Sequence, residues 1–407
     1  MAVAARANRL LRRARSVVVV TTPPSRPARG RKVRTAVSAI VLGFAVALGV
    51  QLVTGWAVRT DRVPLADPQY TDKFAMLRSR PGFAPAEHDR PTTLLFLGSS
   101  RTFNAIDARA VGPALARDLG RPVEAFDFAH AGAGPVTTAV YLRRLLADGV
   151  TPDAVVIEVH PTFLAAQVSP PPEVKWFSPL RLRPDELPLV RALGLPTDAP
   201  AAHGVRGWLT PWHEYRTPLI DRYAPAFSTS RDRVGLGGAT DAHGFARVPD
   251  VPDNQRARLR DLTRRQYSEC WPGYHPGGSG LLGLRDALET CRASGVRAAL
   301  LITPESTEFR AWYGPGGARI APLVAELATE FGAAFFDARE WLADDLIADG
   351  HHLTGSGADA FTGLLARDSL VPWLRLWCGR PACTSGCRRD ARTTTQPETQ
   401  LASGGKP

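Results

Sequence analysis

The stretch Leu-Leu-Phe-Leu-Gly-Ser-Ser-Arg, residues 94–101, joins a short apolar run to an abrupt polar ending. Residues 94–97 are typical of a strand that is buried on both faces. Ligands of a parallel α/β sheet bind outside the carboxyl ends of its strands, so a serine placed there can meet a substrate. Gly-Ser-Ser is also ordinary loop composition, and by itself the stretch indicates only a strand and a turn.

Four further apolar runs resemble this one, and helix-like stretches separate them. The strands we expect cover residues 92–97, 123–128, 154–159, 298–303 and 333–336. Apolar residues at helical spacing lie between them, for example at Tyr141, Leu142, Leu145 and Leu146. Such alternation predicts an α/β fold: a single doubly wound, flavodoxin-like parallel sheet of five strands with right-handed crossovers.

The regular pattern is lost between about residues 165 and 265. This segment is rich in proline and arginine and carries aromatic residues at Trp176, Trp208, Trp212 and Tyr215. It is too long for a simple loop, so we expect an insertion over the crevice that acts as a lid or a substrate-binding subdomain. The alternative is that the aromatic residues form a small satellite core.

The net charge of +11 is concentrated at the start of the chain. Residues 1–34 contain ten arginine and lysine residues and no acid, which leaves 40 cations against 39 acids elsewhere. The body of the protein is therefore close to neutral, and we expect no nucleic-acid partner. The basic arm instead suits contact with anionic lipid.

Residues 35–58 form an uncharged apolar run that is long enough to cross a bilayer as one N-terminal transmembrane helix. The preceding basic arm orients the N-terminus toward the cytoplasm and places the rest of the chain outside the cell membrane. A cleaved signal peptide is the alternative. Residues 59–90 are predicted to be a linker, 91–377 a catalytic domain, and 378–407 a mostly disordered tail that contains cysteine.

All five cysteines follow the apolar run: Cys270, Cys291, Cys378, Cys383 and Cys387. An extracytoplasmic location permits disulfides, and the odd number leaves at least one thiol unpaired within a monomer. A pair between Cys270 and Cys291, pairs of either with the tail, and a simple buried thiol at Cys291 all remain open. The spacing does not favour zinc, and we expect neither a metal nor another cofactor.

Asp349 and His352 lie just after the fifth expected strand and just before the last helix. An aspartate three residues before a histidine can accept the imidazole Nδ1 proton, which leaves Nε2 free to take a proton from a hydroxyl. Together with Ser100 they would supply a nucleophile, a base and its orienting carboxylate. Alone, Asp-x-x-His is an ordinary turn and helix cap.

An attacked carbonyl also needs donors for its developing negative charge. We expect the backbone N–H of Ser100 to be one donor. A second is expected from Gly132, in the glycine-rich turn that follows the second strand. Gly132 could alternatively serve the turn's backbone shape alone.

Gly98-Ser99-Ser100 after the first strand, Gly132 after the second, and residues 349–354 (Asp-Gly-His-His-Leu-Thr) resemble the SGNH (GDSL-like) hydrolase superfamily. Within it the chain looks closest to membrane-anchored, extracytoplasmic members related to alginate O-acetyltransferase-like and teichoic-acid D-alanylation proteins. The resemblance covers about residues 91–375 without the insertion. It implies that Ser100 is the nucleophile, His352 the base and Asp349 its partner.

The sequence departs from the superfamily pattern in two places. Gly-Ser-Ser stands where Gly-Asp-Ser is usual, which keeps the nucleophile position. After the third strand, where the superfamily has Gly-x-Asn-Asp, this chain has residues 159–163, Val-His-Pro-Thr-Phe. His160, Thr162 or Asn104 could replace the missing asparagine, although each also suits an ordinary turn.

Two more residues near the expected crevice are candidates for substrate binding, Arg101 and Glu305. Glu305 could orient a sugar hydroxyl or could form a salt bridge or cap. Asp241 and His243 in the insertion make a second acid–histidine pair, but Asp-Ala-His-Gly is common in turns.

These observations predict a membrane-anchored serine esterase or O-acyltransferase that acts on small acyl esters, acetyl above all, of cell-envelope glycans. Its partners would be membrane lipid, through the anchor and the basic arm, and the glycan or acyl donor. The alternative is a catalytically inactive SGNH-like domain that binds glycan or an envelope-assembly protein.

Overall fold

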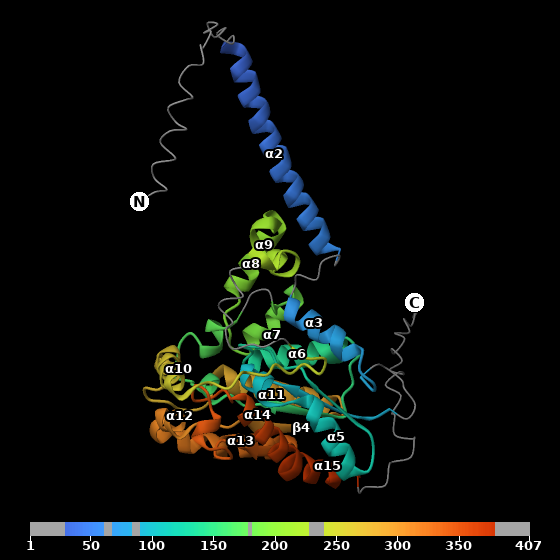
Figure 1. Ribbon diagram of the computed structural model, residues 1–407, viewed down its shortest axis with the longest axis vertical. Coiled ribbons are helices and arrows are strands. Elements are labelled where there is room, and N and C mark those ends of the chain that lie inside the picture. The colour runs from blue at the N-terminus through green and yellow to red at the C-terminus, as the bar shows by residue number, and fades with distance from the viewer. Residues whose placement is uncertain (1–28, 61–66, 84–89, 178–180, 228–239, 379–407) are drawn as a thin grey trace, which may run out of the picture.

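The computed structural model describes residues 29–60, 67–83, 90–177, 181–227 and 240–378. They include one parallel five-stranded sheet with the order β2-β1-β3-β4-β5. Figure 1 shows the sheet, labelled at β4, among the helices that cover it. Its strands are β1 (Thr92–Leu97), β2 (Val123–Asp127), β3 (Ala154–Glu158), β4 (Arg297–Ile302) and β5 (Ala334–Asp337). This is the flavodoxin-like, doubly wound order predicted from the sequence, and its switch point lies between β1 and β3.

Helices cover both faces of the sheet, and this explains the continuous apolar character of the strands. Leu95 and Leu97 of β1 pack on one side, and Leu94 and Phe96 on the other. The first face is covered by α6 (Pro135–Ala147), α11 (Gly278–Ala293) and α13 (Ile320–Phe331). The second is covered by α5 (Ala108–Leu119), α14 (Gly355–Leu365) and α15 (Val371–Cys378).

Short elements connect the strand ends to these layers. Two are the α-helices α4 (Ser100–Ala105) and α12 (Thr307–Trp312), which begin close to the carboxyl ends of β1 and β4. The 3₁₀ turns are η1 (Pro161–Leu164), η2 (Pro172–Lys175), η4 (Pro184–Glu186), η5 (Pro225–Phe227), η7 (Ser268–Cys270), η8 (Gly314–Arg319) and η9 (Asp344–Leu346). A π-helical turn, η10 (Ala366–Leu370), joins α14 to α15.

The segment that we expected to be a linker contains helix α3 (Pro68–Arg78). Tyr70 and Leu77 of this helix belong to the buried core. The Lys73 ammonium is also buried and donates to the carbonyls of Asp127 at 3.0 Å and Ala129 at 2.5 Å. Burial lowers the pKa of Lys73 to about 8. This part of the 59–90 segment is therefore fixed to the carboxyl end of β2.

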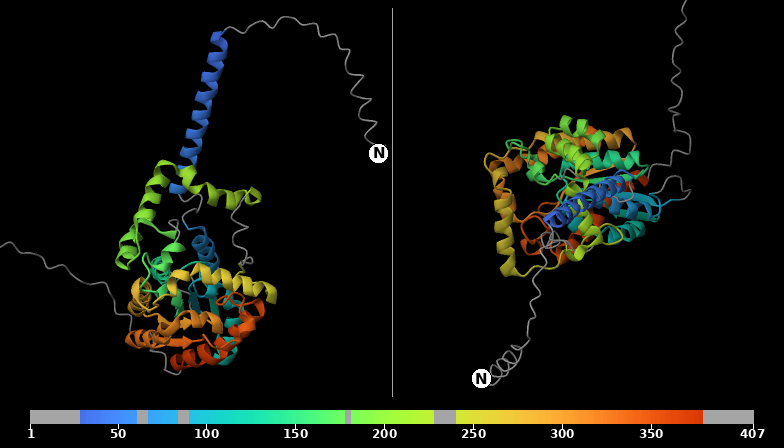
Figure 2. Two further views of the ribbon diagram at one scale, coloured as in Figure 1. Left: turned by 90° about the vertical axis from the view of Figure 1, so that its left-hand side faces the viewer. Right: turned by 90° about the horizontal axis from the view of Figure 1, so that it is seen from above.

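The insertion between β3 and α11 is largely helical. It contains α7 (Leu187–Ala192), α8 (Asp198–Leu209), α9 (Pro211–Tyr223) and α10 (Asp253–Gln266). Helices α8 and α9 lie away from the sheet, and α9 contacts the end of helix α2 (Arg29–Arg59), as both views in Figure 2 show. The aromatic residues of the insertion therefore do not form one unit: Trp176 packs near the sheet edge, whereas Trp208 is 68% exposed far from it.

Helix α2 is the candidate membrane span. Within it, Val33–Arg59 is long and apolar enough to cross a bilayer, and side chains such as Val41, Phe44 and Leu48 are exposed. The basic arm up to residue 28 and the tail from residue 379 lie outside the described residues.

The two cysteines described inside the domain, Cys270 and Cys291, are buried and free, so they do not form a pair with each other. Burial raises the pKa of each thiol to about 12. Both are therefore unreactive core residues in this structure.

Candidate active site

The turn after β1 is shaped around one buried carboxylate. Glu158, the last residue of β3, accepts from the Ser99 amide at 2.6 Å, from the Ser99 hydroxyl at 2.9 Å and from the Thr102 hydroxyl at 2.8 Å. A Cβ at Gly98 would lie 2.4 Å from a Glu158 oxygen, so only glycine fits there. Glu158 therefore fixes the backbone from which the next residue, Ser100, projects.

This arrangement gives the two serines different positions. Ser99 caps the start of α4, with its Oγ accepting from the Arg101 amide at 3.2 Å, and is occupied by Glu158. Ser100 is only partly buried, and its Oγ lies 2.8 Å from His352 Nε2. The structure thus brings together Ser100 and a histidine 252 residues away.

Asp349 holds this histidine in place. Its Oδ2 lies 2.7 Å from His352 Nδ1, and its Oδ1 accepts from the backbone amides of His352 at 2.8 Å and His351 at 3.2 Å. Burial by itself raises the carboxyl's pKa, but the two histidines and the hydrogen bonds from His352 outweigh it and hold the pKa of Asp349 well below its usual range. Asp349 is therefore an ionised acceptor, and His352 keeps its Nδ1 proton and turns Nε2 toward Ser100.

The loop that carries these residues is itself fixed. The Ala348 amide donates to the carbonyl of His352 at 2.7 Å, and Ile347 forms an antiparallel β-bridge with Leu353. Thr354 then caps α14, its side chain accepting from the Gly357 amide at 3.0 Å. The Asp-x-x-His sequence is thus part of a turn that leads into a helix cap, as well as a partner of Ser100.

His351 packs against the other side of His352. Its ring lies 4.1 Å from that of His352, 5.0 Å from Phe309 and 5.6 Å from Tyr267, measured between ring centroids. Burial, with help from His352 and Arg101, lowers the pKa of His351 well below its ordinary value. The neutral His351 ring therefore packs against His352 and restricts the rotation of its side chain.

Asp349, His351 and His352 are also the described group with metal-ligating atoms within 4.8 Å of one another. Two of those atoms, Asp349 Oδ2 and His352 Nδ1, are bonded to each other, and His352 Nε2 contacts Ser100. A metal bound to these atoms would have to replace the serine–histidine contact.

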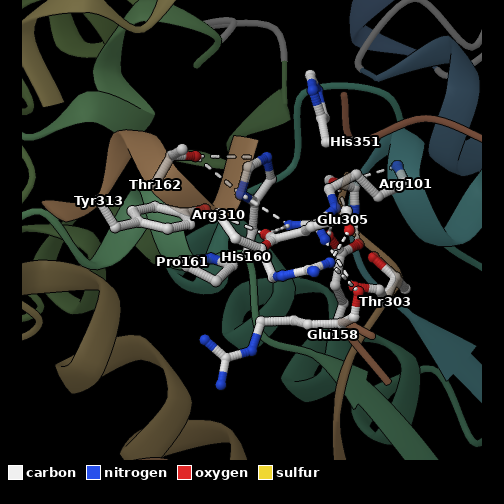
Figure 3. A network of polar contacts seen from close by, with 12 residues as sticks. Arg101, Glu158, His160, Pro161, Thr162, Thr303, Glu305, Arg310, Tyr313 and His351 are labelled. Atoms are coloured by element: carbon white, nitrogen blue, oxygen red, sulfur yellow. Dashed lines mark hydrogen bonds and ion pairs between the residues drawn. The ribbon is translucent and has the colours of Figure 1, made fainter. Parts of the chain in front are cut away.

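Arg101 and Glu305 lie beneath the site rather than in it. Arg101 is 1% exposed, and its Nη1 is 3.0 Å from Glu305 Oε1 while its Nη2 donates to the Thr303 carbonyl at 2.9 Å (Figure 3). Glu305 also accepts from the Tyr313 hydroxyl at 3.1 Å, and burial raises its pKa. Neither side chain has surface for a substrate; the pair instead ties the ends of β1 and β4 together.

The three candidates for the missing asparagine are all buried. His160 follows β3, and its Nδ1 lies 2.8 Å from the Thr162 hydroxyl and 3.4 Å from Arg101 Nη1 (Figure 3). Burial and the nearby guanidinium lower the pKa of His160 well below its usual value, so the ring is neutral. Asn104 lies on α4 with its Oδ1 unpaired among the described residues.

Gly132 lies close to the serine turn through backbone pairing. The His130 amide donates to the Gly98 carbonyl at 2.9 Å, which continues the β1–β2 pairing and carries the 130–134 turn alongside residues 98–100. Gly132 has φ of 71°, and Trp176 covers it so that a Cβ would be 3.1 Å from the Trp176 Cβ. Among the described residues, the backbone amides of Gly132 and Ser100 have no hydrogen-bond partner.

Aromatic residues of the insertion complete the surroundings. Tyr267 lies between the Trp176 ring at 6.2 Å and the His160 ring at 5.9 Å. Of the aromatic residues expected over the crevice, Trp176 is therefore the one that reaches it.

The second acid–histidine pair predicted from the sequence forms a turn. Asp241 Oδ1 accepts from the backbone amides of His243 and Phe245 at 2.8 and 3.0 Å.

Sequence reasoning missed Glu158, His351 and Tyr267. A signal for Glu158 was present, since a carboxylate that ends an otherwise apolar buried strand needs internal partners. The positions of His351 and Tyr267 depend on how the insertion packs, for which the sequence holds no periodic signal.

Comparison with protein-family models gave no match, and comparison with curated proteins gave none either. Solved structures similar to this chain include a carbohydrate acetylesterase from Sinorhizobium meliloti, with 12% identity over 69% of this chain and 99% of that one and a TM-score of 0.33. An inhibitor-bound aryl esterase from M. smegmatis has 14% identity over 68% and 97%, with a TM-score of 0.33. A catalytic mutant of an acetylxylan esterase from Geobacillus stearothermophilus has 12% identity over 68% and 93%, with a TM-score of 0.33. Scores of this size do not assign an activity, which has to come from the geometry of the site.

Proposed function

We propose that this protein is a membrane-anchored serine esterase or O-acyltransferase of the SGNH type. The observation that carries the proposal is the pair of contacts that joins Ser100 Oγ to His352 Nε2 at 2.8 Å and His352 Nδ1 to Asp349 Oδ2 at 2.7 Å. A serine, a histidine and an ionised aspartate in this order form the arrangement that activates a hydroxyl for acyl transfer.

In the first half of the reaction, Ser100 Oγ attacks the ester carbonyl while its proton passes to His352 Nε2. The negative charge that develops on the carbonyl oxygen is stabilised by the amides of Ser100 and Gly132. Collapse of this intermediate breaks the bond to the leaving alcohol, which takes the proton from His352. The acyl group remains on Ser100, and Asp349 stabilises the imidazolium formed in between.

In the second half, His352 Nε2 removes a proton from an incoming hydroxyl, whose oxygen attacks the acyl-serine carbonyl. The bond to Ser100 Oγ then breaks, and Ser100 takes the proton back from His352, which restores both residues. Water gives hydrolysis, and a sugar hydroxyl gives transfer. We propose small acyl esters, acetyl above all, of a cell-envelope glycan as substrates, because the site is partly covered by Trp176 and an aromatic face can stack on a sugar ring. We also propose that the domain lies on the outer side of the cell membrane, and the basic residues that precede α2 support this orientation.

The test uses the full-length protein in detergent and a chromogenic acetate ester. Ser100→Ala should lower kcat/KM by at least about 10³-fold, because it removes the nucleophile. Ser99→Ala is the matched control and should keep measurable activity, since it leaves Ser100 in place. Equal rates for wild type and Ser100→Ala would refute the mechanism.

A catalytically inactive domain that binds glycan or an envelope-assembly protein is the second candidate. It is favoured by the segment after β3, where His160 is held inside the protein and no asparagine side chain follows. A serine-directed fluorophosphonate distinguishes the two candidates. Labelling of Ser100 that disappears in His352→Ala supports the enzyme, whereas glycan binding without labelling supports the binding domain.

A further inference from the structure

Helix α8 presents an apolar face that the protein leaves uncovered. Its exposed apolar residues are Ala201, Ala202, Val205, Trp208 and Leu209. These positions follow the spacing of one helix face, which in a soluble domain would pack against a core. Instead, Val205, Trp208 and Leu209 are 60%, 68% and 60% exposed.

The polar side chains of the hairpin formed by α8 and α9 lie between its two helices. Glu214 of α9 pairs with His203 Nδ1 at 2.8 Å and with Arg206 Nε at 2.8 Å, both from α8. The Tyr215 ring also packs against the His203 ring at 5.8 Å. The hairpin thus joins its helices through charged groups and turns apolar side chains outward, the reverse of a water-soluble helix pair.

The hairpin lies against the last turns of α2. The Trp212 amide donates to the Gln51 side chain at 2.9 Å, and Pro211 packs at Gly55. Thr54 and Gly55 are buried there, whereas the apolar residues nearer the start of α2 are exposed. Both views of Figure 2 show the hairpin beside this end of α2.

The length of α2 sets the level of this contact. The 27 residues of Val33–Arg59 extend about 40 Å, whereas the hydrocarbon core of a bilayer is about 30 Å thick. The last turns of α2, and the hairpin beside them, therefore fall at the height of the lipid headgroups. Tryptophan is enriched at this level of membrane proteins, and Trp56, Trp208 and Trp212 are all exposed there.

We propose that the α8–α9 hairpin lies in the extracytoplasmic headgroup region of the bilayer, with Val205, Trp208, Leu209 and Trp212 inserted among the lipids beside α2. The inference rests on the proposed membrane anchoring and is independent of the esterase activity. The exposed cation Arg216 lies on α9, one helical turn after Trp212, where a lipid phosphate can pair with it. Arg222 of the same helix is instead paired with Asp72 of α3 at 3.1 Å.

The test places the full-length protein in nanodiscs whose lipids carry bromine at a shallow position of the acyl chain, which quenches nearby tryptophan. The chain has nine tryptophans. If they emit equally, Trp56, Trp208 and Trp212 make about one third of the emission quenchable. In the double variant Trp208→Phe/Trp212→Phe the quenchable share should fall to about one seventh. These two side chains are exposed, so their replacement leaves the packing of the body unchanged.

Two single variants separate the possible outcomes. Trp373→Phe, on α15 at the far side of the sheet, should leave three quenchable tryptophans in eight. Trp56→Phe reports on α2 itself and should lower quenching whether or not the hairpin touches lipid. If Trp56 contributes to quenching and Trp208 and Trp212 do not, then a second copy or another protein covers the hairpin and the proposal is overturned. If none of the three contributes, the anchoring fails as well.

Discussion

The sheet edge around Ser100 and the α8–α9 hairpin arrange the same kinds of side chain in opposite ways. At the sheet edge, Arg101 and Glu305 pair at 3.0 Å with both side chains fully enclosed. In the hairpin, Arg206 and Glu214 pair at 2.8 Å, but the Arg206 side chain is 54% exposed, and the apolar residues Val205 and Leu209 on the same helix are also exposed. The first region is rigid because each buried charge depends on its partner. The α8–α9 hairpin exposes its apolar side chains, so its stability depends on what covers them.

The sharpest way to break this comparison is to remove one cation from each region. Arg101→Met leaves Glu158 and Glu305 buried without their positive charge and should lower the free energy of unfolding by about 3–5 kcal/mol. Arg206→Met in the hairpin should cost less than about 1 kcal/mol, because exposed ion pairs contribute little. Chemical denaturation of the detergent-solubilised chain, followed by tryptophan fluorescence, measures both. If both substitutions lower the free energy of unfolding equally, the buried pair Arg101–Glu305 and the exposed pair Arg206–Glu214 contribute equally to stability, and the comparison fails.

Adding one methyl group to a glycine in each region should have opposite effects. Gly98→Ala places a Cβ against Glu158 and should destabilise the protein by about 2–3 kcal/mol through overpacking. Gly204→Ala, on α8, meets no atom within 4 Å and should stabilise by up to about 1 kcal/mol through helix propensity. The same denaturation experiment applies, and a neutral Gly98→Ala would contradict the close fit of the serine turn.

The buried histidines should make the sheet edge sensitive to acid. The pKa of His351 is lowered by burial, so the unfolded chain, whose histidines titrate near pH 6.5, binds more protons than the folded one. Stability therefore falls as the pH drops below about 6.5, and between pH 7 and 5 His351 accounts for about 2 kcal/mol of the loss.

His351→Phe keeps an aromatic ring among Phe309 and Tyr267 and should remove that part of the pH dependence. Thermal unfolding of wild type and variant at several pH values provides the measurement. Parallel profiles for the two proteins would mean that His351 already carries its charge in the folded state.

The smallest effect is expected for an apolar side chain of the hairpin. Leu209→Ala should change the free energy of unfolding in detergent by less than about 0.5 kcal/mol, because Leu209 is 60% exposed and packs on no core. Leu301→Ala in β4, which is fully buried, should cost about 2–5 kcal/mol. A large loss for Leu209→Ala would show that protein, and not lipid, covers this face.

The strands were predictable because burial on both faces makes them continuous apolar runs. Each expected strand begins and ends within one residue of the observed one, as with residues 298–303 and Arg297–Ile302. The helical hairpin was not predictable, because the stripe around Trp208 faces outward and Pro218 interrupts the pattern of α9. Helix α3 did leave a signal: Asp67 followed by Pro68 is a typical helix start.

The candidate site divides in the same way. Ser100, Asp349 and His352 were found through short motifs, and their catalytic role stays a prediction until the serine is tested. The support beneath them was not found, because the partners of Arg101 are Glu158 and Glu305, which are far apart in the sequence and meet only where the strands end. Arg101 and Glu305 were expected to bind substrate because the sequence shows that both follow the carboxyl ends of strands. It does not show that their side chains are buried beneath the site.

The contact of Lys73 with the end of β2 has a mechanical consequence. Helix α3 follows the end of α2 after eight residues and is fixed to the carbonyls of Asp127 and Ala129, just before the turn that holds Gly132. The proposed membrane anchor is thus connected to the edge of the sheet that carries the candidate site and not to the opposite edge. If α2 is the membrane anchor and Ser100 the nucleophile, as proposed, the site has a short reach and acts on material close to the bilayer, and a pull on α2 acts on the strand end beside Ser100.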